Sequence, residues 1–200
     1  MKQFKIKHSG TEYHVFAEDA LSAVAKLKDA STDPTETYRE CSIGELIELC
    51  ELQPKSEQIT SAEMEYINNG AEINKRFREG LSTKEDLNLI KTLQKGMAPI
   101  PVGIKIFRTN TVETIKNNKG LELNPILSCT PNNSEIIPEN IGEVKEKLEI
   151  LVDKDTRLRV MSNPYEDEVI LNGQDIDYKV IKQKEVDGIK YKTLWVRNKR

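Results

Sequence analysis

The chain has 200 residues, with 30 Lys and Arg against 33 Asp and Glu and a formal net charge of −3. This composition is typical of a soluble globular protein, and it excludes the chain-wide basic field of many nucleic-acid-binding proteins. The N-terminus lacks the apolar run of a signal peptide, and no stretch approaches the roughly 20 apolar residues of a membrane span. We therefore expect a cytoplasmic protein, made there or delivered into a host cell, with no membrane partner.

Cysteine usage gives no sign of a metal site. The three cysteines are Cys41, Cys50 and Cys129, and they cannot all pair within one chain. There is no Cys-x-x-Cys pair and no histidine cluster, so we interpret them as reduced thiols and expect no metal.

Residues 1–55 are predicted to form a small ββα-type module of unknown role. Alternating apolar residues around a Ser9-Gly10 turn signal predict a hairpin, and apolar residues at helical spacing predict helices. The predicted elements are strands at 2–7 and 13–17 and helices at 20–27 and 42–52. Residues 29–40 are polar and rich in turn-forming residues, and a linker is predicted around residues 53–60 at the end of the module.

Residues 56–200 are predicted to form a second domain that begins with helices. Two capping boxes, Thr60 with Glu63 and Ser82 with Glu85, predict helices that run to about residue 78 and about residue 95. Gly80 is placed to end the first of these helices. Strands are expected afterwards at 102–108, 125–129, 157–161, 169–171, 178–184 and 190–196, with short helices at 112–117 and 141–148. Helices followed by strands indicate an α+β fold.

Four polar features follow in a fixed order along this second domain. Taken singly, each is typical of a solvated helix face, a polar strand end or an acidic turn. They are Tyr66, Asn74 and Arg78 within one sector of a helix, Arg108 at a strand end, Ser128-Cys129-Thr130 at another strand end, and Glu166-Asp167-Glu168 before an apolar strand.

Each of these features also allows a chemical interpretation from its residue types. A guanidinium such as that of Arg108 can hold phosphate with paired hydrogen bonds. The hydroxyls of Ser128 and Thr130 point to one side of their strand and can orient a carboxylate or a ribose. If the strand begins at Glu166, then Glu166 and Glu168 share a strand face roughly 7 Å apart, which tends to separate their pKa values. Such a pair suits a reaction in which one carboxylate stabilises a cation and the other handles a proton.

In their order and spacing, these features resemble the Arg–Ser–Glu class of mono-ADP-ribosyltransferases, in particular the bacterial exoenzyme group with the C3-like and binary actin-modifying toxins. The resemblance covers about residue 58 to the end of the chain. The matching positions are Ile73, Asn74, Phe77 and Arg78 for the helix motif, Arg108 for the motif arginine, Ser128-Cys129-Thr130 for the Ser-Thr-Ser strand, and Glu166-Asp167-Glu168 for Glu-x-Glu. Cys129 and Thr130 depart from that pattern. No aromatic residue lies between Arg108 and Tyr165 to pack on nicotinamide, and the loop at 162–165 is short.

The resemblance implies two facing, mainly antiparallel β-sheets with an N-terminal helical subregion and NAD, as co-substrate, bent into the cleft. It implies phosphate contacts from Arg108 and Arg78, with Asn74, Tyr66 and Thr130 lining the NAD site. Ser128 would orient Glu168, which would accept a hydrogen bond from the nicotinamide-ribose 2′-hydroxyl. A fixed anion there stabilises the positive charge that develops on the ribose as nicotinamide leaves.

The resemblance also implies an arginine acceptor on a target protein, because a Glu at the position of Glu166 goes with arginine modification in this family. Glu166 would orient the guanidinium and take its proton, and Tyr165 could stack on it. A small transferase of this kind suits a phage protein or effector acting on host machinery, with no direct nucleic-acid partner. The alternatives are an NAD glycohydrolase toxin, a catalytically silent binding protein with the same fold, and an adaptor without an NAD site.

Overall fold

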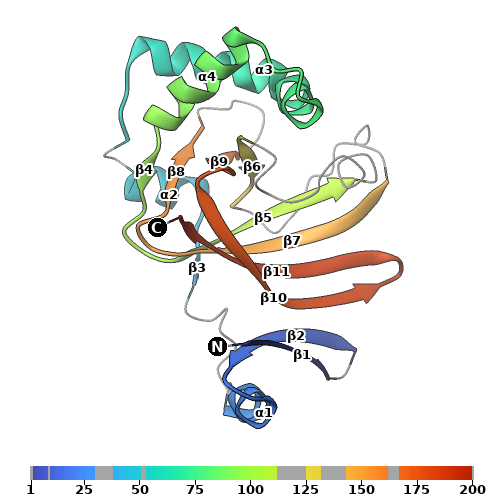
Figure 1. Ribbon diagram of the computed structural model, residues 1–200. Coiled ribbons are helices and arrows are strands. Elements are labelled where there is room, and N and C mark those ends of the chain that lie inside the picture. Colours follow the sequence, from blue (N-terminus) through green and yellow to red (C-terminus); the bar gives the residue numbers. More distant parts are fainter. Residues whose placement is uncertain are drawn as a thin grey trace.

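Two β-sheets and four helices make up the described part of the computed structural model (Figure 1). The structure describes residues 2–8, 10–29, 38–50, 53–111, 125–131, 143–161 and 167–199. The helices are α1 (Ala20–Asp29), α2 (Ile43–Leu49), α3 (Glu57–Glu79) and α4 (Lys84–Lys95). The strands are β1 (Lys2–His8), β2 (Thr11–Ala17), β3 (Arg39–Glu40), β4 (Ala98–Pro99), β5 (Ile104–Thr111), β6 (Leu127–Cys129), β7 (Val144–Val152), β8 (Arg157–Val160), β9 (Val169–Leu171), β10 (Ile176–Val186) and β11 (Ile189–Asn198).

The strands form a seven-stranded sheet with the order β1-β2-β10-β11-β7-β5-β3 and a four-stranded sheet with the order β4-β8-β9-β6. The pairs β11–β7 and β3–β5 are parallel, and the other pairs are antiparallel. The predicted α+β class with two mainly antiparallel sheets is therefore confirmed. None of the described helices is long and apolar enough to cross a lipid bilayer.

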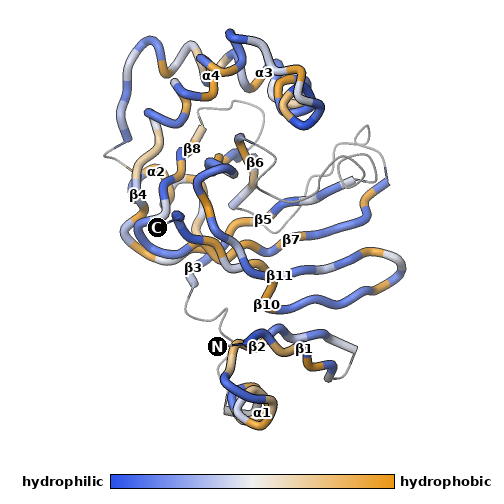
Figure 2. Tube along the Cα trace, viewed as in Figure 1, coloured by the Kyte–Doolittle hydropathy of each residue, from blue (hydrophilic) through white to orange (hydrophobic). Residues whose placement is uncertain are grey.

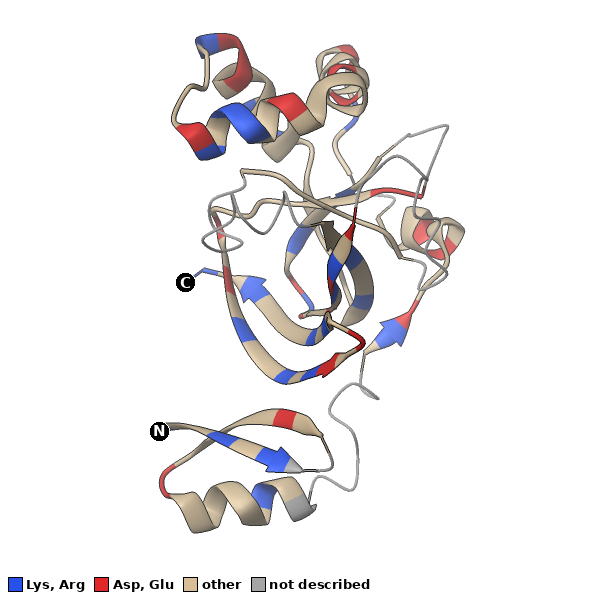
Figure 3. Ribbon diagram, turned by 90° about the vertical axis from the view of Figure 1, so that its right-hand side faces the viewer, with Lys and Arg blue, Asp and Glu red and all other residues tan. Residues whose placement is uncertain are grey.

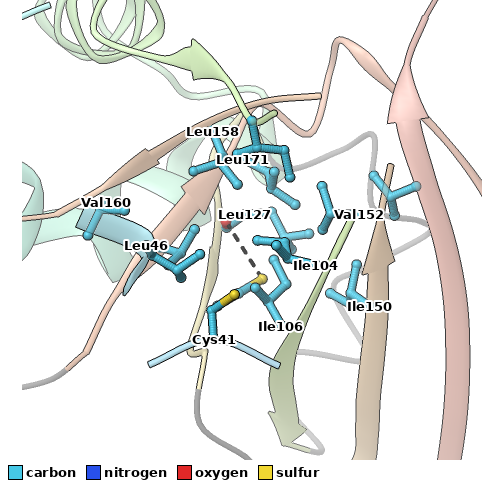
Figure 4. Close-up of a cluster of buried hydrophobic side chains, with 14 of the residues drawn as sticks. Cys41, Leu46, Ile104, Ile106, Leu127, Ile150, Val152, Leu158, Val160 and Leu171 are labelled. Carbon is cyan, nitrogen blue, oxygen red and sulfur yellow. Dashed lines mark hydrogen bonds between the residues drawn. The ribbon is translucent and has the colours of Figure 1, made fainter. Parts of the chain in front are cut away.

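The smaller sheet is covered on both faces, because side chains alternate along its strands. Val169 and Leu171 of β9 point into a core between the two sheets, here called the sheet core, whereas Ile170 points into a second core beneath the helices, the helix core. Figure 4 shows the sheet core, to which β5 contributes Ile104 and Ile106. In Figure 2 hydrophobic residues gather where the sheets meet, and the far ends of β10 and β11 are mostly hydrophilic.

The two sheets are joined where β5 passes the end of β6. The Phe107 N–H donates to the Thr130 carbonyl at 2.7 Å, and the Thr130 N–H donates to the Phe107 carbonyl at 2.8 Å. This short bridge places Arg108, the next residue of β5, beside the strand that carries Ser128.

Helix α3 begins one turn earlier than predicted. Its N-cap is Ser56, whose hydroxyl accepts from the Ile59 N–H at 3.2 Å, and Thr60 is already helical, with its hydroxyl bonded to the Ser56 carbonyl. The predicted capping role of Glu63 was therefore wrong. The helix ends as predicted at Gly80, which adopts a left-handed conformation with φ of 72° that a glycine accepts without steric cost.

Helix α4 begins one residue later than predicted. The capping box is formed by Thr83 and Asp86, not by Ser82 and Glu85. Asp86 also accepts two hydrogen bonds from Arg76 of α3, at 2.8 Å and 2.6 Å. The same carboxylate thus caps α4 and ties it to α3.

The Glu63 side chain forms a buried ion pair and does not cap a helix. The Arg159 Nε donates to the Glu63 carboxylate at 2.6 Å, and the exposed fractions of the two side chains are only 5% and 3%. Arg159 belongs to β8, and its Nη1 donates to the backbone carbonyls of Pro54 and Gly96 at 3.0 Å and 2.8 Å. This one guanidinium fixes α3 and the end of α4 on the smaller sheet.

The predicted helix at residues 141–148 was wrong. From Val144 onward the chain forms β7, which lies between β5 and β11 in the larger sheet. Glu, Lys and Leu are good helix formers, but Leu148, Ile150 and Val152 recur every second residue and enter the sheet core. Burial of that alternating face overrides the helical propensity. The predicted helix at 112–117 lies outside the described residues.

The first 55 residues divide into two parts. The hairpin β1–β2 and α1 form as predicted, and β2 extends the larger sheet by pairing with β10 along Thr11–Tyr13. By contrast, β3 pairs with β5 within the stretch expected to be turns. Cys41, Leu46 and Cys50, which flank or belong to α2, are buried in the sheet core, and Figure 4 shows the first two of them.

Candidate active site

The carboxylate of Glu168 is held by a serine on the neighbouring strand. The Ser128 hydroxyl donates to Glu168 Oε1 at 2.6 Å, a short distance typical of a hydrogen bond to a charged acceptor. Ser128 lies opposite Ile170 in the β6–β9 register, and Glu168 precedes Ile170 by two residues. Alternation therefore places all three side chains on the side of the smaller sheet that faces the helix core. Glu168 is only 6% exposed.

Arg108 reaches the same point from the larger sheet. Its Nη1 donates to the backbone carbonyl of Ser128 at 2.5 Å, and the side chain is half-buried. Arg108 of β5, Ser128 of β6 and Glu168, which directly precedes β9, are far apart in the sequence and form one hydrogen-bonded group.

Helix α3 adds Tyr66 and Asn74 above this group. The Asn74 Nδ2 donates to the Tyr66 hydroxyl at 2.8 Å, because the long Tyr66 side chain spans the two helical turns between these residues. Burial raises the pKa of Tyr66, and the nearby Glu168 carboxylate raises it further, while the Asn74 hydrogen bond and Arg108 act in the opposite direction. Tyr66 thus lies within electrostatic reach of both charged residues and remains a neutral phenol.

A glycine shapes this part of the helix. A Cβ atom at Gly70 would lie 3.0 Å from the Tyr66 ring, closer than ordinary van der Waals contact. Gly70 lies one turn after Tyr66 on α3 and therefore leaves space for the ring to lie along the helix. A glycine in the middle of a long predicted helix is the sequence feature that could have indicated this packing.

Cys129 points away from the group and does not belong to it. Its side chain lies in the sheet core, and burial raises the pKa of its thiol to about 12, with Arg108 lowering and Glu168 raising it. The thiol is therefore protonated at physiological pH and unsuited to act as a nucleophile. This agrees with the prediction that Ser128 and Cys129 point to opposite sides of their strand.

The structure thus brings together five of the predicted site residues: Arg108, Ser128, Glu168, Tyr66 and Asn74. Arg78 is half-buried near the end of α3, and Thr130 contributes the backbone bridge to Phe107. Tyr165 and Glu166 lie outside the described residues. Two residues that the sequence did not indicate, Asn110 and Glu146, contact the group through Arg108.

One buried polar atom is consistent with a ligand at this position. The Asn74 Oδ1 is buried, and no hydrogen-bond donor for it exists among the described residues. A buried carbonyl oxygen without a donor is unfavourable, and a donor on a bound ligand would satisfy it. Within the described ranges, no group of three His, Cys, Asp or Glu residues is arranged to hold a metal.

The fold is the one seen in solved ADP-ribosyltransferases. Neither a protein-family model nor a curated protein matches the sequence, but solved ADP-ribosyltransferases share the architecture. An ADP-ribosyltransferase from Clostridium botulinum is 14% identical with a TM-score of 0.63, over 80% of this chain and 98% of that one. Exoenzyme S from Pseudomonas aeruginosa, solved with human 14-3-3 protein beta and carba-NAD, is 15% identical with a TM-score of 0.56, over 70% and 74%.

A third solved structure extends the likeness along the chain. The ADP-ribosylating toxin BECa from a binary enterotoxin of C. perfringens, solved with NADH, is 16% identical with a TM-score of 0.54. The match covers 98% of this chain but only 55% of that toxin. At these identities the likeness shows a common fold, and it confirms the fold that the sequence motifs predicted.

Proposed function

We propose that this protein is a mono-ADP-ribosyltransferase that cleaves NAD at the nicotinamide bond and transfers ADP-ribose to an arginine of a target protein. The observation that carries the proposal is the hydrogen-bonded group of Arg108, Ser128 and Glu168 on an ADP-ribosyltransferase fold. The sequence analysis predicted the activity from the same three residues in the same order along the chain.

NAD would bind with its phosphates on Arg108 and Arg78, as the motif resemblance implies. A guanidinium has five N–H donors, so the two contacts of Arg108 with Ser128 and Asn110 leave donors for a phosphate oxygen. The Asn74 Oδ1 supplies an acceptor for a hydroxyl or amide of the same ligand. Two of the solved proteins with this fold contain carba-NAD or NADH, which supports NAD as the co-substrate here.

Glu168 would be the catalytic residue. The Ser128 hydroxyl orients its carboxylate, which would accept a hydrogen bond from the ribose 2′-hydroxyl. The bond between C1′ and the nicotinamide nitrogen breaks, and its electron pair leaves with nicotinamide. Positive charge then develops on the ribose beside a buried, fixed anion, which stabilises the transition state more than bound NAD.

The acceptor step would use Glu166. A guanidine nitrogen of the target arginine attacks C1′, a C–N bond forms, and the proton lost from the guanidinium passes to the Glu166 carboxylate. Tyr165 would contact the same guanidinium. Arginine specificity rests on the identity of residue 166 within the Glu-x-Glu motif.

Labelled NAD tests this proposal. Wild-type protein, incubated with cell lysate and NAD labelled in the adenylate, should transfer the label to protein, and hydroxylamine should release it as it does from ADP-ribosyl-arginine. Glu166→Gln should abolish protein labelling and leave part of the NAD cleavage. Asp167→Asn is the matched control, because Asp167 lies between the two glutamates but is exposed.

Each other outcome identifies an alternative. Free ADP-ribose without labelled protein would indicate an NAD glycohydrolase. Intact NAD in all samples would indicate a silent protein with this fold. Equal loss of labelling and cleavage in Glu166→Gln would show that the two glutamates do not have separate roles.

A further inference from the structure

Arg108 is held by a chain of polar residues that crosses three adjacent strands, and two of them, Asn110 and Glu146, are buried. The Arg108 Nε donates to Asn110 Oδ1 at 3.0 Å, and the Asn110 Nδ2 donates to Glu146 Oε2 at 2.7 Å. The other oxygen of Glu146 forms an ion pair with Lys192 at 2.5 Å. Asn110 and Glu146 are direct cross-strand partners in the β5–β7 register, and they are only 4% and 9% exposed.

The charges along this chain dictate the orientation of the Asn110 amide. An ionised carboxylate only accepts hydrogen bonds, and a guanidinium only donates them. The NH₂ end of Asn110 must therefore face Glu146, and its carbonyl end must face Arg108. Reversing the amide would set its carbonyl against Glu146 and its NH₂ group against Arg108, so Glu146 selects the orientation that suits Arg108.

Arg108 is thus fixed at two points. Asn110 holds Nε, and the Ser128 carbonyl holds Nη1. An arginine side chain otherwise has many rotamers, and ordering it upon binding would weaken affinity for a ligand. Contacts that order it beforehand strengthen affinity without touching the ligand.

We propose that Asn110 and Glu146 are positioning residues that pre-order Arg108 for the NAD phosphates, an inference that rests on the proposed function. Asn110 acts directly on Arg108, and Glu146 acts through Asn110. Lys192 neutralises the buried Glu146 charge from the opposite side.

A thermodynamic cycle on NAD affinity, measured by calorimetric titration, tests the inference. The net value of one hydrogen bond corresponds to roughly two- to tenfold in affinity, so Asn110→Ala should weaken NAD binding by about that factor. In an Arg108→Ala background, the same substitution should have no further effect, because there is no guanidinium left to position. A purely structural role would give the same loss in both backgrounds.

Two further variants separate positioning from stability. Glu146→Gln keeps an oxygen that accepts from the Asn110 amide and should retain most of the affinity, whereas Glu146→Leu should weaken NAD binding as Asn110→Ala does. Asn172→Ala is the matched control: Asn172 is also a buried asparagine, but it directly follows β9 and bonds to Asp175. It should lower the melting temperature and leave NAD affinity unchanged. Asn110→Ser replaces Asn110→Ala if the alanine variant does not fold.

The cleavage kinetics give a second readout. Because the phosphates are remote from the bond that breaks, Asn110→Ala should raise the KM for NAD more than it lowers kcat. Wild-type NAD binding that is weakened by Arg108→Ala but not by Asn110→Ala or Glu146→Leu would overturn this inference alone. A wild-type protein that binds no NAD would overturn the proposed function and this inference with it.

Discussion

The helix pair α3–α4 and the hairpin unit, here β1, β2 and α1, are attached to the sheets in different ways. The helix pair shares a buried apolar core with the smaller sheet and is fixed by the buried Arg159–Glu63 ion pair. The hairpin unit is joined to the larger sheet by the pairing of β2 with β10, by a Gln183–Glu12 hydrogen bond at 3.0 Å and by Lys179, which lies 4.2 Å from the centre of the Phe16 ring. Figure 1 shows the two units at opposite ends of the molecule.

This difference shows which additions to the sheets belong to the site. The helix pair carries Tyr66 and Asn74 and cannot move without moving them. The hairpin unit carries none of the site residues and is attached mainly through backbone hydrogen bonds at a sheet edge. We therefore propose that the hairpin unit serves recognition of the target protein, and that the helix pair is part of the catalytic domain.

Truncation of the N-terminus at two different positions should give the largest effect on folding and activity. A chain that begins at residue 54 loses Cys41, Leu46 and Cys50 from the sheet core, and we expect it not to fold. A chain that begins at residue 38 keeps them, and we expect it to fold and cleave NAD but to label target protein poorly. Removal of β2 exposes the edge of β10, where Lys182 and Lys184 oppose aggregation by edge-to-edge pairing.

Circular dichroism, NAD cleavage and protein labelling on the same samples decide between these outcomes. Loss of structure in the chain that begins at residue 38 would contradict the separability of the hairpin unit. A folded chain that begins at residue 54 would contradict the place of α2 in the core.

Breaking the buried ion pair should give the next largest effect. Glu63→Leu leaves the Arg159 guanidinium buried without its partner, and such changes lower the free energy of unfolding by about 3–5 kcal/mol. Adding Arg159→Met should recover much of that loss. In the hairpin unit, the Lys5–Glu12 pair has a Lys side chain that is 65% exposed, so Lys5→Ala should cost less than about 1 kcal/mol.

Urea unfolding of the wild type and these three variants measures this difference between the two units. Equal effects of Glu63→Leu and Lys5→Ala would contradict the argument that the helix pair is the more firmly attached unit.

The link between the two helices of the pair should depend on pH. The hydrogen bonds from Arg76 lower the pKa of Asp86 to about 2 from its ordinary value of 3.8, against an opposing effect of burial. A lowered carboxyl pKa stabilises the fold above the unfolded-state value, and this contribution disappears as pH falls from about 4 through 2. Arg76 is about a third exposed, so solvent screening limits the contribution to about 1–2 kcal/mol.

Asp86→Asn should therefore lower the free energy of unfolding at pH 7 and converge with the wild type near pH 2. A difference that persists unchanged at pH 2 would show that capping of α4, rather than the charge of Asp86, accounts for it.

The sequence predicted the residues of the site better than the residues that position Arg108. Runs of apolar, β-branched and aromatic residues indicated β9, β10 and β11, and the chain order of Arg108, Ser128 and Glu168 indicated the group that the structure brings together. The segment of β7 is rich in helix formers and was assigned to a helix, and this concealed Glu146. Its partner Asn110 lies 36 residues earlier, and only the strand pairing brings the two together.

Charge patterns were equally ambiguous where tertiary contacts decide their role. Glu63 fits a capping box in the sequence, but in the structure it pairs with Arg159, 96 residues later. Acidic and basic residues are interspersed over the helices and strands (Figure 3), so the pattern alone did not distinguish a buried pair from a solvated one.

The most direct test of the central claim is NAD cleavage by Glu168→Gln. The substitution keeps the shape of the side chain and an oxygen that accepts from Ser128, but it removes the negative charge beside the ribose. Loss of one electrostatic stabiliser of a transition state typically lowers kcat by about 10²–10³. We predict a loss of at least this size, with an unchanged circular dichroism spectrum and with wild-type activity in Asp167→Asn. NAD cleavage by folded Glu168→Gln at the wild-type rate would contradict the account.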